Sequence, residues 1–168
     1  MAADMLDLIL EESEAHGLER YEVSAFARPG HRCVHNLNYW QFGDYLGIGA
    51  GAHSKLSFPH RVIRQVRYKE PERYMQQASQ GHVITQDIEV ARSELPFEFM
   101  LNALRLKEGF LLQDFIYRTG GLPLSSIEAA LAEAERQNLL SRDWEKAQPT
   151  PQGFDFINYL QQLFLSAS

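Results

Sequence analysis

The sequence predicts an α+β chain with a mixed first part and a mostly helical second part. Near the start, apolar residues at helical spacing are followed, after a glycine, by the alternating pattern typical of a strand. Strand patterns bounded by Pro and Gly continue to about residue 70. Beyond residue 93 the apolar residues recur mainly at helical spacing, so the two parts differ in class.

Length and composition exclude several classes of protein. The chain has 168 residues, enough for one ordinary domain or two small ones, and its 45% hydrophobic residues exclude intrinsic disorder. A net charge of −6 argues against nucleic acid as a partner, and the one cysteine, Cys33, cannot close a disulfide within the chain. Apolar runs are short and the start of the chain is acidic, so we expect a cytoplasmic location and no transmembrane segment.

The first elements are predicted from periodicity and glycines. Asp4 to His16 has apolar residues on one side and ends at Gly17, which predicts a helix. Arg20 to Phe26 alternates and predicts one short strand, stopped by Pro29.

The next segment carries many hydrogen-bonding side chains and then many glycines. Residues 29–42 have no clean period, which predicts a long functional loop. Tyr45 to Gly49 is a further strand candidate, and glycines recur at every second position from Gly47 to Gly51. Such a stretch lets either another strand or a ligand approach the backbone closely, and the residues alone do not decide between them.

Two strands, a helix and a linker are expected next. Ser54 to Phe58 and His60 to Tyr68 flank Pro59, and the second of them is rich in cations that can receive carboxylates. Pro71 starts a helix that runs to about Gln80, and the polar segment 81–92 is expected to be a linker.

The second part is expected to contain four helices and a short β wing. The helices are predicted over Leu95 to Leu106, Leu112 to Tyr117, Ser125 to Asn138 and Gln152 to Leu165, with the wing between the last two. That order resembles a winged helix. Residues 93–168 hold six Lys and Arg against ten Asp and Glu, so we expect no nucleic acid to bind there.

His31, Cys33 and His35 alternate along the chain and are the candidates for metal binding or nucleophilic catalysis. In an extended loop the three side chains point the same way, but a closed zinc site needs a fourth ligand. Cys33 beside His35 lacks any local signature of a catalytic thiol. We therefore expect no metal site and no catalytic residue in this chain.

Three motifs carry a resemblance to a known family. The runs Tyr21-Glu22-Val23-Ser24, His35-Asn36-Leu37-Asn38-Tyr39-Trp40 and Asp44 to Ser54 resemble the radical SAM family of oxygen-independent coproporphyrinogen III oxidases, closest to its HemW-like branch. Phe97-Glu98 to Arg105-Leu106 and Thr150 to Gly153 resemble that family's HemN-type C-terminal domain. The resemblance implies the last strands and helix of a partial (β/α) barrel over residues 1–70, a connecting helix and linker over 71–93, and the C-terminal domain over 94–168.

The resemblance also implies cofactors and limits the activity of this chain. Family members hold a [4Fe-4S] cluster on three closely spaced cysteines and use it to cleave S-adenosylmethionine to a radical. With Cys33 alone, this chain is not expected to generate a radical or to hold these cofactors by itself. When the missing part is supplied, the resemblance implies that seven residues lie near S-adenosylmethionine or the substrate face of the barrel, namely Leu37, Asn38, Gly49, Ala50, Gly51, Ala52 and His53.

In the HemW-like branch the implied role is haem or porphyrin binding and haem delivery. The candidate haem contacts are His35 and His53 as axial ligands, and Tyr39 and Trp40 as stacking groups. Two alternatives stay open: oxidative decarboxylation of coproporphyrinogen III by a full-length protein, and a non-catalytic winged-helix interaction module. The expected partners are haem or a porphyrin, and either the missing barrel half or a second copy at an open barrel edge.

Overall fold

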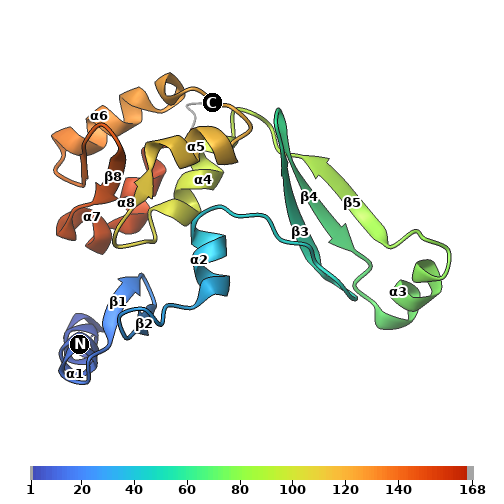
Figure 1. The fold of residues 1–168 in the computed structure, drawn as a ribbon, viewed down its shortest axis with the longest axis horizontal. Coiled ribbons are helices and arrows are strands. Elements are labelled where there is room, and N and C mark those ends of the chain that lie inside the picture. Colours follow the sequence, from blue (N-terminus) through green and yellow to red (C-terminus); the bar gives the residue numbers. More distant parts are fainter. Residues whose placement is uncertain (1, 166–168) are drawn as a thin grey trace.

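The computed structural model describes residues 2–165 and has an α+β fold. Figure 1 shows a helical body that contains α4 to α8, a three-stranded sheet that extends from it, and an N-terminal helix and hairpin on another side. No helix among the described residues is long and apolar enough to cross a membrane.

The N-terminal part is a helix followed by a hairpin. α1 spans Ala2–Ala15, and Gly17, with a φ of +73°, follows it as expected. The single strand predicted over Arg20 to Phe26 is wrong: the chain forms β1 (Glu19–Glu22) and β2 (Ala25–Ala27), which pair antiparallel. The carboxylate of Glu22 accepts hydrogen bonds from the amide and hydroxyl of Ser24, at 3.0 Å each, and this stabilises the turn between the strands.

The long loop predicted over residues 29–42 contains a helix. α2 spans Val34–Trp40 and contacts α4. Its side chains show little apolar periodicity, so the helix depends on packing rather than on an amphipathic stripe. The strand predicted over Tyr45 to Gly49 is reduced to one isolated β-bridge between Tyr45 and Lys55.

The extended sheet has the order β3-β4-β5 and is antiparallel throughout. The predicted strands on either side of Pro59 are confirmed as β3 (His53–Phe58) and β4 (Arg61–Arg67), and the predicted helix as α3 (Pro71–Ala78). The expected linker instead contains β5 (Ile84–Glu89), which pairs with β4. All described strand pairs are antiparallel, so the expected partial barrel is not confirmed.

The helical body confirms the four predicted helices, the last as two pieces. α4, α5 and α6 span Leu95–Ala103, Leu112–Arg118 and Glu128–Arg136, with the short helix η1 (Leu124–Ser126) between the last two. α7 (Pro151–Asp155) and α8 (Ile157–Gln162) meet at Phe156. A small sheet of order β6-β8-β7 completes the body, from Phe110–Leu111, Lys146–Pro149 and Leu140–Arg142.

One hydrophobic core connects the sheet to the helical body. Phe42, Val62 and Val90 belong to the same buried cluster as Phe99 and the other apolar side chains of the body. The N-terminal hairpin is attached separately, because the amide of Lys107 donates to the carbonyl of Tyr21 at 3.0 Å. The apolar core therefore crosses the boundary expected near residue 93, while the domain limits themselves stay a prediction.

Candidate functional site

α2 and the bridge residue Tyr45 form a row of three rings. His35 and Tyr39 lie one helical turn apart on α2, and their ring centroids are 4.8 Å apart in an edge-on arrangement. Tyr39 in turn packs against Tyr45, with 4.7 Å between ring centroids. His35 is exposed and the two tyrosines are half-buried, so the row leads from the solvent to the sheet.

The strand register places His53 on the face that carries Tyr45. Tyr45 and Lys55 exchange two backbone hydrogen bonds of 3.0 Å, and residues opposite each other in such a pair share a face. His53 lies two residues before Lys55 on β3, so its side chain leaves the same face and is exposed. Two of the four predicted haem contacts, His35 and Tyr39, are thus joined to Tyr45 by ring contacts, and His53 leaves the sheet on the same face as Tyr45.

Trp40 has different surroundings. It lies about 100° round α2 from Tyr39, and the guanidinium carbon of Arg105 is 4.2 Å from the centroid of its ring system. Arg105 also donates to the buried carboxylate of Glu22 at 3.1 Å. Trp40 therefore packs against an ion pair that joins the N-terminal hairpin to the helical body.

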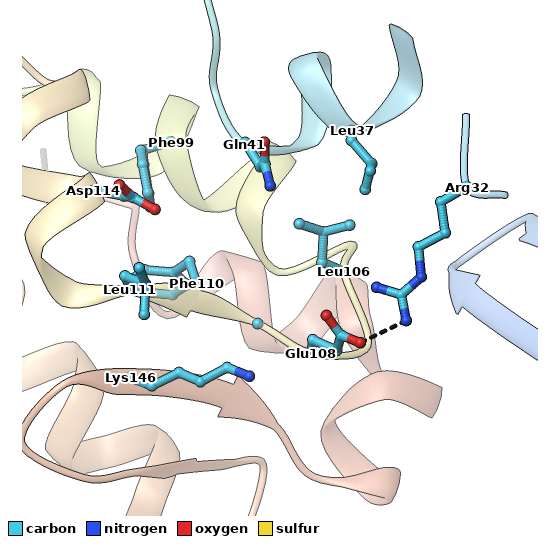
Figure 2. Close-up of a pocket in the computed structure, with 11 residues that line it drawn as sticks. Arg32, Leu37, Gln41, Phe99, Leu106, Glu108, Phe110, Leu111, Asp114 and Lys146 are labelled. Carbon is cyan, nitrogen blue, oxygen red and sulfur yellow. Dashed lines mark hydrogen bonds and ion pairs between the residues drawn. The ribbon is translucent and has the colours of Figure 1, made fainter. Parts of the chain in front are cut away.

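Leu37 and Asn38 also have structural surroundings. The side-chain amide of Asn38 donates to the carbonyl of Asp44 at 3.0 Å, which holds the turn after α2. Leu37 lines a cavity of about 250 Å³ between α2 and β6. Figure 2 shows Leu37 near Leu106, and the guanidinium of Arg32 joined to Glu108 across the rim at 2.5 Å.

The glycine stretch is held to β4 and α3 through its backbone. A Cβ on Gly47 would lie 2.2 Å from the carbonyl oxygen of His53, so here the close approach is to the chain itself. The amide of Gly51 donates to the carbonyl of Tyr68 at 2.7 Å. Gly49, with a φ of +106°, is different because a Cβ there would meet no atom within 4 Å. Of the two neighbouring alanines, Ala50 is exposed and Ala52 half-buried.

A buried lysine that the sequence did not single out lies beneath this surface. Lys55 has a 2% exposed side chain, and its ammonium group donates to the carbonyl of Phe42, to Asp44 and to Ser57 at 2.9 to 3.1 Å. Burial lowers the pKa of Lys55 below its usual value despite the neighbouring carboxylate. The network fixes the segment after α2 to β3 and so sets the position of Tyr45.

The same network determines the ionisation of Asp44. Burial alone would raise the pKa of this carboxyl group, but it accepts hydrogen bonds from the amide and hydroxyl of Ser57 and from Lys55. Together these donors lower the pKa of Asp44 below its usual value, so this carboxyl group is ionised near neutral pH. Asp44 and Lys55 come from segments eleven residues apart, and no local pattern marks them as partners.

The alternating triplet His31, Cys33 and His35 does not stay extended. α2 begins at Val34, so the alternation that would align the three side chains ends at Cys33, which is exposed. Within residues 2–165, no three His, Cys, Asp or Glu side chains are grouped as metal ligands.

Comparisons with known proteins agree with the motifs. Residues 90–156 match the family described as the HemN C-terminal domain. "Heme chaperone HemW" of Escherichia coli is 42% identical over 90% of this chain and 39% of its own length, and its Haemophilus influenzae counterpart is 40% identical over 89% and 38%. The chain thus spans about two fifths of the length of these relatives.

A solved structure shows that the fold is shared more widely. The coproporphyrinogen III oxidase HemN of Escherichia coli, described as a radical SAM enzyme, is similar with a TM-score of 0.66. The likeness covers 98% of this chain and 41% of that protein, at 18% sequence identity. At this identity the likeness supports the fold alone.

Proposed function

We propose that this chain contributes a haem-binding surface, because residues 90–156 match the HemN C-terminal domain and two heme chaperones HemW are 42% and 40% identical to the chain. The relatives with the higher sequence identity are named as heme chaperones, whereas the oxidase is similar at the level of fold. We therefore favour haem or porphyrin binding over porphyrinogen decarboxylation as the proposed role.

The ring row of α2 carries this proposal. His35, Tyr39 and Tyr45 are in successive contact, and His53 leaves the sheet on the face of Tyr45. Haem is a flat, largely apolar macrocycle whose iron accepts an imidazole nitrogen, so exposed histidines beside tyrosine rings suit it. In this proposal His35 and His53 are the candidate iron ligands and Tyr39 stacks on the macrocycle. Trp40 supports the surface from its contact with Arg105.

We propose a narrower role for the predicted S-adenosylmethionine residues. Ala50 is exposed, and Gly49 leaves space where a side chain would stand, although its amide already donates to the hydroxyl of Tyr74 at 3.3 Å. Gly51, Ala52 and His53 continue from them towards β3. The side-chain amide of Asn38 already donates to the carbonyl of Asp44, and Leu37 lines a cavity within this chain. We therefore propose that these two residues stabilise the S-adenosylmethionine surface and do not contact the ligand. A [4Fe-4S] cluster does not fit, because the chain has one cysteine.

We also propose the nature of the partners. α1 leaves four apolar side chains at least 39% exposed, namely Met5, Leu6, Leu8 and Ile9, and this face suits the remainder of a barrel or a second copy. The helical body, with α5, α6 and the β7–β8 hairpin in sequence, is proposed to be winged-helix-like. Its excess of acidic residues favours protein over nucleic acid, in a cytoplasmic setting.

A titration with haemin tests the haem-binding surface. We expect the 168-residue chain to bind haemin with a shifted Soret band. Removing an axial imidazole should move that band and weaken haemin binding by about tenfold, so His35→Ala and His53→Ala should each differ from the unmodified chain.

The control is a third exposed histidine outside the surface. His82 lies between α3 and β5, so His82→Ala should leave the spectrum and the affinity unchanged. Identical spectra for all four proteins would remove the ligand assignment, and no binding by the unmodified chain would contradict the proposed function.

A further inference from the structure

A second cavity lies between the β3–β4 turn and α5, away from the ring row. It has a volume of about 400 Å³, within the range of small-molecule sites. Phe58 and Pro59 form one wall, and Ile116, Tyr117 and Arg118 form the opposite wall. At about 30 Å³ for each water-sized group, the cavity holds on the order of a dozen such groups.

The two walls are fixed relative to each other. The guanidinium of Arg92 donates to the carbonyl of His60 at 3.2 Å and to that of Gly120 at 3.3 Å, and so ties the hairpin turn to the end of α5. Gly120 has a φ of +69°, and a Cβ there would lie 3.1 Å from the amide nitrogen of Arg61. The close approach of Gly120 to Arg61 and the hydrogen bonds of Arg92 therefore hold the two walls of the cavity at a fixed separation.

The charges around the cavity leave one positive charge in excess. Asp44 is on the rim, but the ammonium group of Lys55 neutralises its carboxylate. The same carboxylate accepts hydrogen bonds from the amide and hydroxyl of Ser57. Across residues 2–165, no carboxylate forms an ion pair with Arg118. Arg118 lines the cavity, and it therefore supplies the positive charge that stays unpaired there.

The aromatic residues on the two walls are open to solvent. Phe58 is 43% exposed and Tyr117 is 72% exposed, although both line the cavity. A flat group placed between the two walls would cover apolar surface on both side chains. The guanidinium of Arg118, whose central carbon is 5.4 Å from the centroid of the Tyr117 ring, stands beside that space.

We propose that this cavity binds a small carboxylic acid with a flat apolar body. The carboxylate pairs with Arg118, whose planar guanidinium suits a carboxylate, and the apolar body lies between Phe58 and Tyr117. The excess of one positive charge selects a monoanion over a neutral or cationic analogue. This site shares no residue with the ring row of His35, Tyr39 and Tyr45, although Asp44 and Ser57 on its rim belong to the network that positions Tyr45.

Phenylacetate is the probe for this proposal, and the neutral phenylacetamide is its matched control. We expect phenylacetate to shift the amide resonances of Ser57, Tyr117, Arg118 and Gly121 in the ¹⁵N-labelled full chain. Phenylacetamide should bind about tenfold or more weakly, since it lacks the charge that pairs with Arg118. Added salt should weaken the binding of phenylacetate because part of the site is open to solvent.

Variants distinguish a specific contact with Arg118 from nonspecific binding of phenylacetate to the protein surface. Arg118→Gln should weaken phenylacetate binding about tenfold, whereas Arg28→Gln, at an exposed arginine outside the cavity, should leave it unchanged. Tyr117→Ala should weaken both probes by a similar factor because it removes an apolar wall. Equal binding of the two probes, full binding by Arg118→Gln, or no shifts up to about 10 mM phenylacetate would overturn the proposal.

Discussion

Phe99→Ala is expected to lower the free energy of unfolding by about 3–5 kcal/mol. Phe99 is 1% exposed, and its ring meets those of Phe42, Phe110 and Phe115 edge-on, with centroids 5.2 to 5.5 Å apart. Truncation leaves a cavity at the point where the segment after α2 joins the helical body. Urea unfolding followed by circular dichroism measures the loss.

The matched control for this prediction is another phenylalanine of the same body. Phe156 is 61% exposed at the junction of α7 and α8, so Phe156→Ala should change the free energy of unfolding by less than about 0.5 kcal/mol. Because the core contains residues from both parts of the chain, Phe99→Ala should keep a single unfolding transition at a lower urea concentration. An equal effect of the two substitutions would contradict the described core.

Lys55→Met is expected to cost about 1–3 kcal/mol, the cost of leaving a buried polar partner unsatisfied. The methionine retains most of the apolar stem, but the carbonyl of Phe42 and the carboxylate of Asp44 lose their shared donor. Asp44 has a 40% exposed side chain, so water can compensate in part, and the loss should stay below that of a fully buried ion pair. Urea unfolding again gives the magnitude.

Lys69→Met is the control for the lysine, because Lys69 is exposed on the same part of the chain. It should leave the free energy of unfolding within about 0.5 kcal/mol of the unmodified chain. If Lys55→Met were equally silent, the ammonium group of Lys55 would not fix the segment after α2. The double variant of Lys55→Met with Asp44→Asn should lose less than the sum of the single losses, since the two groups interact directly.

Strong local signals predicted much of the fold. α1 and the β3–β4 hairpin were predicted correctly because apolar periodicity and Pro59 act within a few residues of chain. β5 was missed because all of its residues are exposed and its two isoleucines, Ile84 and Ile88, are separated by three polar residues in a segment that follows Gly81. β5 forms because β4 offers a free edge for hydrogen bonding. The residues of β5 alone contain no pattern that indicates this pairing.

The missed helix α2 has a related cause. Its polar side chains suggested a loop, yet it is held by packing of Trp40 on Arg105 and by contacts with α4, both far away in sequence. The motif resemblance named His35, Tyr39 and His53 as contacts but not Tyr45, whose ring packs against Tyr39. Lys55 could not be predicted as buried, since a lysine on a strand usually faces solvent and its partners come from residues 42–44.

We propose a division of roles, in which this chain supplies a haem-binding surface and holds no radical-generating cluster by itself, because Cys33 is its one cysteine. The most direct test is anaerobic incubation of the 168-residue chain with ferrous iron and sulfide, followed by S-adenosylmethionine and a reductant, with released methionine measured. The account predicts no methionine above that of a protein-free control. Release of methionine by the chain alone, retained in Cys33→Ala, would contradict it.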